Sequence, residues 1–194
     1  MSSLPNEIPP FKLTKKVTTT SGTSKFVDIV NDTLFTDKKV VIFGLPGAFT
    51  PTCSEQQLPG FEELYLEFRE WGIDDIYCFT VNDTFVCTKW AEDLGLINVK
   101  VIPDGSAEFT IKMGMDVRKD NIGFGIRSWR YAAVYDNGVL EKAFVEEGFS
   151  DNLDGDPYEA STPENVLAYV KQPPVGKHID LAFSDTTDVK ETFQ

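Results

Sequence analysis

The feature that most constrains this chain is a buried-strand pattern that runs through a short loop into a helix pattern. Residues 39–45 are almost wholly apolar, as is typical of a strand covered on both faces of a sheet. Residues 46–53 read Pro-Gly-Ala-Phe-Thr-Pro-Thr-Cys, and helical apolar spacing follows them. We therefore expect Cys53 in the first turn of a helix that leaves the carboxyl end of a strand.

This position favours a reactive thiol. Unpaired backbone N–H groups and the helix dipole favour negative charge at a helix N-terminus, and a cysteine there ionises more readily than a free thiol. Cys53 is therefore a candidate nucleophile. Taken alone, a cysteine at a helix start is often only a capping or packing residue, so the surrounding residues must decide between the two interpretations.

Charge and residue counts exclude several functions. The chain carries 31 acidic and 18 basic side chains, and its net charge of −13 would repel nucleic-acid phosphates. His178 is the only histidine and no Cys-x-x-Cys pair is present, so neither Cys–His catalysis nor a zinc site is expected. Three unpatterned cysteines also favour a reducing compartment over a disulfide scaffold. We expect no nucleic-acid partner and no metal.

The sequence gives no sign of a membrane or export segment. No apolar run approaches the roughly 20 residues of a membrane span. The first ten residues have no basic stretch followed by an apolar core, as a signal peptide would. We therefore expect a cytoplasmic protein that does not associate with membranes.

The N-terminal region is expected to be extended and then to form strands. Pro5, Pro9 and Pro10 block regular structure in the first residues. Residues 11–36 alternate apolar and polar types around a Thr/Ser/Gly-rich segment, which predicts short strands or a hairpin. The chain is expected to divide into an extended arm at 1–10, a domain at 11–172 and a C-terminal tail at 173–194.

Strand and helix patterns alternate along the middle of the chain. In order, they are strand 39–45, helix 52–71, strand 75–81, helix 83–95, strand 99–102 and helix 106–113. The first of these helices is expected to bend or break at Pro59-Gly60. This alternation predicts a mainly parallel sheet with helices on its faces.

The pattern changes in the last third of the chain. Strands at 130–135 and 139–145 flank Asn137-Gly138, a strong signal for an antiparallel hairpin with a type I′ turn. Residues 161–164, Ser-Thr-Pro-Glu, resemble a capping box that opens a helix ending at Val170. Parallel strands, an antiparallel hairpin and a final helix predict an α/β protein of thioredoxin-like fold, with a central mixed sheet flanked by helices.

The residues around Cys53 suit attack of a thiolate on a peroxide. The thiolate attacks one oxygen in line, and the other oxygen leaves with growing negative charge. The Thr50 hydroxyl, an arginine and the backbone N–H groups of Thr52 and Cys53 could stabilise that charge. Pro46 and Pro51 present no N–H and could exclude water. A peroxide leaving group needs little acid assistance, so the lack of a nearby histidine is no obstacle.

The motif Pro46-x-x-x-Thr50-x-x-Cys53 matches the active-site signature of peroxiredoxins, which are thiol peroxidases with a thioredoxin fold. Further segments resemble the type-five subfamily: Leu58-Pro-Gly-Phe61, Val81-Asn-Asp83 and Arg127-Ser-Trp-Arg-Tyr131. Residues 123–131 are especially similar to members fused to a glutaredoxin domain. The resemblance covers roughly residues 8–170 and combines separate motifs, so it is specific.

The resemblance implies a role for each matching residue. Cys53 is the nucleophile, Thr50 donates to and accepts from the thiolate and the peroxide, and Pro46 shields the pocket. Arg130 supplies positive charge, and its place before the hairpin strand favours it over Arg127. Four further residues are expected to contact substrate: Thr52, Phe49, Arg127 and Phe124. For the two phenylalanines, core packing or a dimer surface remain open alternatives.

The chain departs from the subfamily in the cysteine that would reduce Cys53. Many type-five members carry a resolving cysteine between the hairpin and the last helix, and fused members carry a glutaredoxin Cys-x-x-Cys. Residues 156–164 contain no cysteine, and Cys78 and Cys87 lie in apolar patterns that favour packing. The resemblance therefore implies a single-cysteine cycle. Hydrogen peroxide or a small alkyl hydroperoxide forms the Cys53 sulfenic acid, and glutathione with a separate glutaredoxin or thioredoxin reduces it.

The same resemblance implies a homodimer and no cofactor. A cysteine phosphatase is excluded because position 59 is proline rather than arginine, and a dithiol oxidoreductase because position 56 is glutamine. The open alternative is a non-enzymatic redox sensor or interaction protein of thioredoxin fold. The acidic segment 146–159 is expected to be a solvated loop, because its order does not fit a calcium-binding loop.

Overall fold

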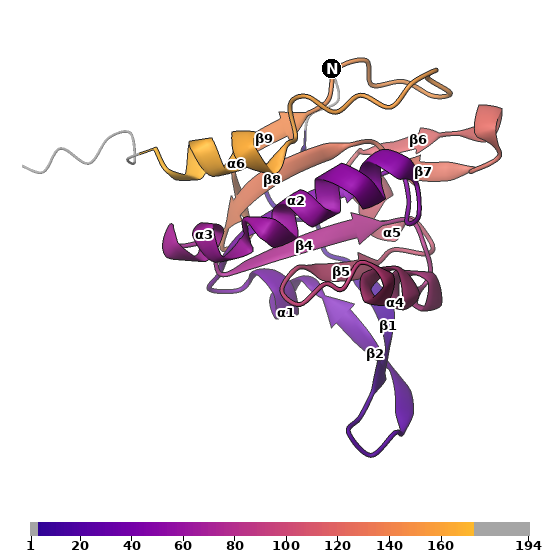
Figure 1. Cartoon of the computed structure of the whole chain (residues 1–194), viewed down its shortest axis with the longest axis vertical. Helices are drawn as coiled ribbons and strands as arrows, with labels where there is room; N and C mark the ends of the chain where they lie inside the picture. The colour runs from indigo at the N-terminus through magenta and orange to yellow at the C-terminus, as the bar shows by residue number, and fades with distance from the viewer. Residues whose placement is uncertain (1–3, 173–194) are drawn as a thin grey trace, which may run out of the picture.

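The computed structural model describes residues 4–172, so the predicted tail at 173–194 and His178 lie outside the described residues. A five-stranded sheet forms the centre, in the order β5-β4-β3-β8-β9 (Figure 1). Three of its strands are parallel: β3 (Lys39–Leu45), β4 (Asp75–Thr80) and β5 (Lys100–Pro103). β8 (Tyr131–Asp136) runs antiparallel to β3, and β9 (Val139–Val145) pairs antiparallel with β8 at the edge of the sheet. The mixed sheet is therefore as predicted.

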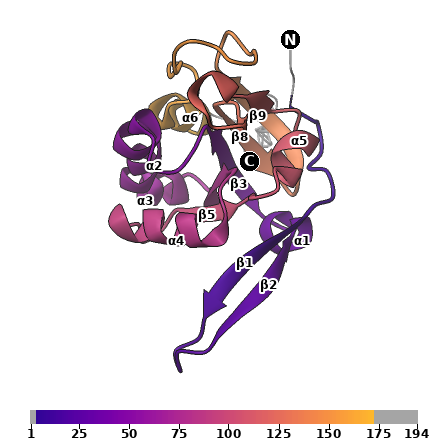
Figure 2. The same cartoon turned by 90° about the vertical axis from the view of Figure 1, so that its right-hand side faces the viewer.

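Helices cover both faces of the sheet (Figure 2). One face carries α2 (Leu58–Glu63), α3 (Tyr65–Glu70), α4 (Thr84–Asp93) and α6 (Pro163–Val170). The other carries α1 (Asn31–Phe35), α5 (Glu108–Lys112) and the start of a hairpin made of β1 (Lys12–Thr18) and β2 (Ser24–Val30). The far end of this hairpin projects from the body (Figures 1 and 2). This arrangement confirms the thioredoxin-like α/β fold and the N-terminal hairpin.

The apolar run of β3 is explained by a core on each side of the sheet. Side chains alternate along a strand, and Val40 and Ile42 join one cluster of buried residues. Val41 and Phe43 join the other cluster, beneath the helices on the opposite face. All four are fully buried. The strand that leads to Cys53 is therefore fixed from both faces.

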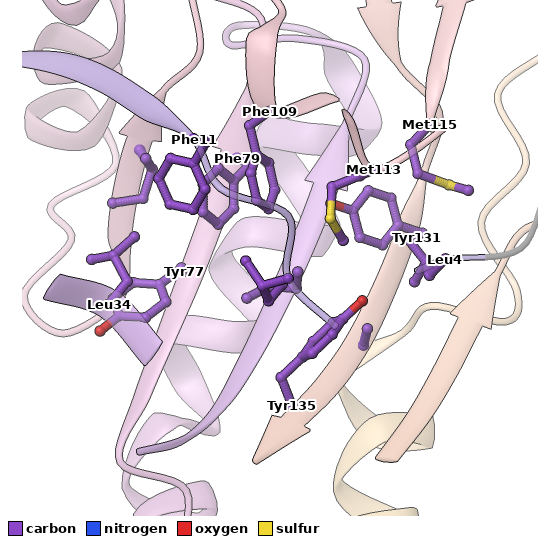
Figure 3. Close-up of a cluster of buried hydrophobic side chains, with 14 of the residues drawn as sticks. Leu4, Phe11, Leu34, Tyr77, Phe79, Phe109, Met113, Met115, Tyr131 and Tyr135 are labelled. Carbon is purple, nitrogen blue, oxygen red and sulfur yellow. The ribbon is translucent and has the colours of Figure 1, made fainter. Parts of the chain in front are cut away.

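The first cluster includes the N-terminal arm (Figure 3). Leu4, Ile8 and Phe11 are buried, so residues 4–11 cover the sheet. The ring of Phe11 meets that of Phe109 edge-on at 5.0 Å, and Phe109 stacks on Phe79 at 3.9 Å. These aromatic contacts attach the arm and α5 to β4.

The turn between β8 and β9 is of the predicted type. Asn137 and Gly138 both have positive φ, 47° and 79°, which is the conformation of a type I′ turn. The turn sets the register of β8 against β9 and so positions Arg130, the residue directly before β8.

The helix after Cys53 differs from the prediction. Its first turn is a π-helix, η1 (Cys53–Gln57), in which the Leu58 N–H donates to the Cys53 carbonyl. The break falls at Leu64, between α2 and α3, rather than at Pro59-Gly60. Pro59 lies in the first turn of α2, where its missing N–H is tolerated.

The predicted capping box at Ser161 is also wrong. Thr162 caps α6, because its side chain accepts a hydrogen bond from the Asn165 N–H at 3.3 Å. The Ser161 hydroxyl cannot serve this role, since it donates to Glu146 at 2.7 Å.

One small sheet was not predicted. β6 (Asp116–Arg118) pairs antiparallel with β7 (Ile126–Ser128), and the 3₁₀ turn η2 (Asp120–Ile122) lies between them. Strands of three residues are too short for periodicity to reveal. None of the helices in the described part of the chain has the length and apolar composition needed to cross a membrane.

Gly44 provides a test of how closely β3 and its neighbours pack. A Cβ atom built there would lie 2.5 Å from Ser128 Oγ and even closer to a ring carbon of Tyr131. We expect Gly44→Ala to lower the free energy of unfolding by about 1–3 kcal/mol, because the buried core must shift. Urea denaturation measures this. Gly105→Ala is the matched control, since a Cβ there has no neighbour closer than 3.4 Å; equal stability of both variants would contradict the interpretation.

Candidate active site at Cys53

Cys53 is a buried free thiol at the start of η1. Its exposed fraction is 0%. The loop at residues 46–52 reaches it from the carboxyl end of β3, and Phe49 in that loop has a φ of 62°. A non-glycine residue in this left-handed region is uncommon and marks a sharp turn. The Ser54 N–H donates to the Thr50 carbonyl at 3.0 Å, which fixes the loop to the first helical turn.

Arg130 is the arginine that contacts Cys53. Its side chain is 1% exposed, and Nη1 donates to Cys53 Sγ at 3.6 Å and to Gln57 Oε1 at 2.6 Å. Nε donates to the Pro157 carbonyl at 3.0 Å, and Nη2 forms an ion pair with Asp156. All three guanidinium nitrogens are therefore engaged, and one of them points at the sulfur.

This network keeps a buried guanidinium charged. A charge in the protein interior is unfavourable unless it is paired and hydrogen-bonded. Burial alone would lower the pKa of Arg130, but the charges of the Cys53 thiolate and of Asp156 outweigh burial and raise it above the ordinary value. The site therefore presents a fixed positive charge beside the thiol.

Glu146 holds the loop that covers Arg130. Oε1 accepts hydrogen bonds from the Ser161 N–H and hydroxyl at 2.8 and 2.7 Å, and Oε2 accepts from the N–H groups of Glu159 and Ala160 at 3.0 and 3.1 Å. Burial acts to raise the pKa of Glu146, but these hydrogen bonds outweigh it and lower the pKa. The segment at 146–159 was predicted to be solvated. This is wrong for its first residue, since Glu146 is 3% exposed.

Arg127 and Asn82 fix the start of the active-site loop. Arg127 Nη1 donates to the Pro46 carbonyl and to Asn82 Oδ1, both at 3.4 Å. Asn82 Oδ1 also accepts from the Ala48 N–H at 2.9 Å. Arg127 Nε donates to the Phe124 carbonyl at 3.1 Å. The predicted residues Pro46, Arg127 and Phe124 therefore lie together beside the loop.

Thr50 and Phe49 are placed differently from Arg130. The Thr50 hydroxyl donates to the Gly47 carbonyl at 2.7 Å rather than to Cys53, so its lone pairs are what it offers to the pocket. Phe49 is 53% exposed and its ring lies 6.5 Å from that of Trp90. Thr52 is half-buried directly before Cys53. Phe49 thus forms the rim of the site rather than part of the core.

Sequence analysis missed several residues that hold Arg130. Gln57 had a usable signal, because residues four apart share a helix face and this one is polar and close to Cys53. Asp156, Pro157 and Glu146 had none, since a loop far along the chain reveals its contacts only after folding. Asn82 belongs to the Val81-Asn-Asp83 motif, but the resemblance assigns this residue no role.

The other two cysteines are packing residues. Burial raises the pKa of the Cys78 thiol well above its ordinary value and that of Cys87 to about 12. Cys87 Sγ lies 3.6 Å from the Asn82 carbonyl. The surroundings of Cys78 and of Cys87 agree with the prediction that each is a packing thiol. Within residues 4–172, no group of three His, Cys, Asp or Glu side chains is arranged to hold a metal ion.

Known proteins resemble this chain over most of its length. Residues 6–157 match the family described as Redoxin. A protein of Rhizobium etli named peroxiredoxin is 60% identical over 149 residues, which are 77% of this chain and 83% of that protein. The hybrid peroxiredoxin hyPrx5 of Haemophilus influenzae is 49% identical over 146 residues, 75% of this chain and 59% of that protein. The solved structure of the Plasmodium falciparum antioxidant protein, described as a 1-Cys peroxiredoxin, has a TM-score of 0.79 and 37% identity, over 88% of this chain and 99% of that chain.

Gln57→Ala tests whether the direction of Arg130 matters for Cys53. The change removes a buried acceptor of the guanidinium, so Arg130 Nη1 is no longer held toward the sulfur. We expect the rate constant for oxidation of Cys53 by hydrogen peroxide to fall about tenfold, the equivalent of one weakened charge-assisted hydrogen bond. Stopped-flow tryptophan fluorescence measures it. Gln56→Ala, at an exposed neighbour, is the control, and equal rates in the two variants would contradict the role of Gln57.

Glu146→Gln tests the attachment of the covering loop. At pH 7 we expect the free energy of unfolding to fall by about 1–3 kcal/mol, because a buried, fully hydrogen-bonded carboxylate is lost. The folded pKa is lowered, so the advantage of the wild type is complete above the unfolded pKa of roughly 4.3 and is lost as pH falls through the folded value.

Urea denaturation of both proteins between pH 7 and pH values below the folded pKa would measure this difference. The exposed neighbour supplies the control, Glu147→Gln. A stability difference that stays constant across this pH range would rule out the carboxylate as its source.

Proposed function

This chain belongs to the peroxiredoxin family of thiol peroxidases, within the type-five subfamily. We propose that it reduces hydrogen peroxide and small alkyl hydroperoxides with Cys53 as the nucleophile, and that glutathione and glutaredoxin restore the thiol. The observation that carries this proposal is the hydrogen bond from Arg130 Nη1 to Cys53 Sγ inside a buried, fully paired guanidinium network.

In the first step the Cys53 thiolate attacks the terminal oxygen of the peroxide. An S–O bond forms as the O–O bond breaks, and the leaving oxygen takes a proton and departs as water or an alcohol. Arg130 stabilises the developing charge from a position that needs no rearrangement. The Thr50 oxygen can accept the hydrogen bond of the incoming peroxide, and Pro46, Phe49 and Thr52 belong to the same loop between β3 and η1. Cys53 is left as a sulfenic acid.

The second step needs a thiol from outside the chain. Cys78 and Cys87 are buried, and burial raises the pKa of both, so neither is suited to attack the sulfenic acid. Glutathione would condense with Cys53 to give a mixed disulfide and water. A glutaredoxin thiolate would then attack the glutathione sulfur and release the Cys53 thiolate. A relative named hybrid peroxiredoxin and a similar structure described as a 1-Cys peroxiredoxin support this assignment.

We also propose that the protein is a cytoplasmic homodimer built from the domain at 11–172. The dimer rests on resemblance to the subfamily, and Phe49 and Phe85, which expose more than half of their surface, would supply apolar area for the contact. A monomeric mass at micromolar concentration in sedimentation equilibrium would refute the dimer, and recovery from a membrane or exported fraction would refute the location.

Cys53→Ser provides the direct test of the peroxidase cycle. We expect peroxide consumption with glutathione and glutaredoxin to be abolished, because the nucleophile is lost. The double variant Cys78→Ala/Cys87→Ala should retain turnover within about twofold, because neither thiol takes part in the cycle. Intact-mass spectrometry should detect a glutathione adduct on Cys53 in wild type.

Three outcomes would contradict the proposal in different ways. Undiminished turnover in Cys53→Ser would remove the nucleophile assignment. Loss of turnover in the double variant would point to an internal resolving thiol. Oxidation of Cys53 without glutathione-dependent turnover would favour a redox sensor or a different reductant.

A further inference from the structure

Arg127 is a cation without an anionic partner in the described part of the chain, and it contacts the loop that leads to Cys53. The chain has 31 acidic residues, yet within residues 4–172 no carboxylate lies within ion-pair distance of this guanidinium, whereas Arg130 is paired with Asp156. Its Nε and Nη1 donate to the uncharged oxygens of Phe124, Pro46 and Asn82. Nη2 has no hydrogen-bond partner in the described part of the chain, so its two N–H groups remain available.

The guanidinium is held firmly in this position. It lies over the Phe124 ring with its central carbon 5.0 Å from the ring centroid, and it packs against Gly47, where an added Cβ would be 2.7 Å from Nη1. The Phe124 ring is itself 36% exposed. Nη1 donates to the carbonyl of Pro46, the first residue of the loop that leads to Cys53. A cation with free donors therefore lies against Pro46 and Gly47, at the start of the loop that leads to Cys53.

We propose that Arg127 and Phe124 form a carboxylate-recognition subsite at the mouth of the Cys53 pocket. The inference rests on the proposed function, because it assigns the part of that site that selects the second reactant. Hydrogen peroxide is neutral and has no group for this subsite. Glutathione carries two carboxylates that take no part in sulfur chemistry, and a fatty-acid hydroperoxide carries one. A guanidinium donates charge-assisted hydrogen bonds to a carboxylate with defined geometry.

A thiol reductant is the favoured source of the carboxylate. In the reducing step, the reductant S–H and the Cys53 sulfenic acid form an S–S bond and release water, while the carboxylate remains unchanged on Arg127. Holding that carboxylate raises the local concentration of the thiol and directs its sulfur toward Cys53. A second thiol, that of glutaredoxin or of another reductant molecule, then attacks the reductant sulfur of this mixed disulfide and releases the Cys53 thiolate, so the two thiols together supply the two electrons.

The test compares each acidic reactant with a partner that lacks its free carboxylates. Cys53 is oxidised with one equivalent of hydrogen peroxide, and its reduction is followed by stopped flow with two matched pairs: mercaptoacetate against 2-mercaptoethanol, and glutathione against its diethyl ester. Loss of the hydrogen bonds to Pro46 and Asn82 should slow the acids and their esterified or hydroxylated partners alike, so the subsite is tested by the acid-to-partner ratio of rate constants. We expect that ratio to fall about five- to tenfold in Arg127→Gln and to recover in part in Arg127→Lys.

Arg118→Gln is the matched control. Arg118 lies on β6, which pairs with the strand of Arg127, but its side chain is 59% exposed and ion-paired with Asp120. Its removal changes net charge equally and should leave the acid-to-partner ratio unchanged. Each ratio is taken within one variant, so a partial loss of active protein cancels.

A second arm identifies the source of the carboxylate. The rate of Cys53 oxidation is measured with a fatty-acid hydroperoxide and with its methyl ester. A selective loss for acidic thiols supports the subsite as a reductant site, and a selective loss for the acidic hydroperoxide supports it as a peroxide site. Equal loss for acidic and neutral reactants, or no loss at all, overturns the proposal. If wild type fails to use glutathione, the proposed cycle is wrong, but the mercaptoacetate comparison still tests the subsite.

Discussion

The structure depends above all on one buried guanidinium. Arg130 is almost completely removed from water, and such a charge is tolerated only if every nitrogen has a partner. Its partners come from two distant parts of the chain: η1 supplies Gln57 and Cys53, and the covering loop supplies Asp156 and Pro157. Chemistry at the thiol and stability of the covering loop therefore share the same hydrogen bonds.

The sheet topology explains why these parts meet. β8 runs antiparallel to β3, and Gly44 pairs with Tyr131, so the start of β8 lies beside the end of β3. The loop to Cys53 leaves β3 at this point. Arg130 is the residue directly before β8, and a helical turn places Cys53 and Gln57 on the side that faces it. Arg130, which precedes the β8–β9 hairpin, thus contacts Cys53, which lies 77 residues earlier in the chain.

Features that depend on residues close together in the sequence could be predicted, and features that depend on distant residues could not. The strand at 39–45, the Asn137-Gly138 turn and the sheet alternation depend on local periodicity and turn chemistry, and all were predicted. Cys53 was singled out by its place between a strand and a helix, and Arg130 by motif resemblance; Arg130 Nη1 lies 3.6 Å from Cys53 Sγ, and the catalytic roles of both residues stay predictions. Contacts with residues far along the chain help to determine three other features: the π turn, the break at Leu64 and the hydrogen bonds of Glu146. Local sequence patterns do not reveal those contacts, so these features were not predicted.

The missing side chain at Gly44 has a consequence for both arginines. Ser128 Oγ and the Tyr131 ring occupy the space where its Cβ would be, and each of these residues directly follows an arginine in the chain, Arg127 and Arg130. The backbone beside each arginine is therefore packed against the same residue of the central strand, Gly44. The packing at Gly44 therefore sets the spacing between the backbones of Arg127 and Arg130. It also sets their spacing from the loop to Cys53, which begins two residues after Gly44.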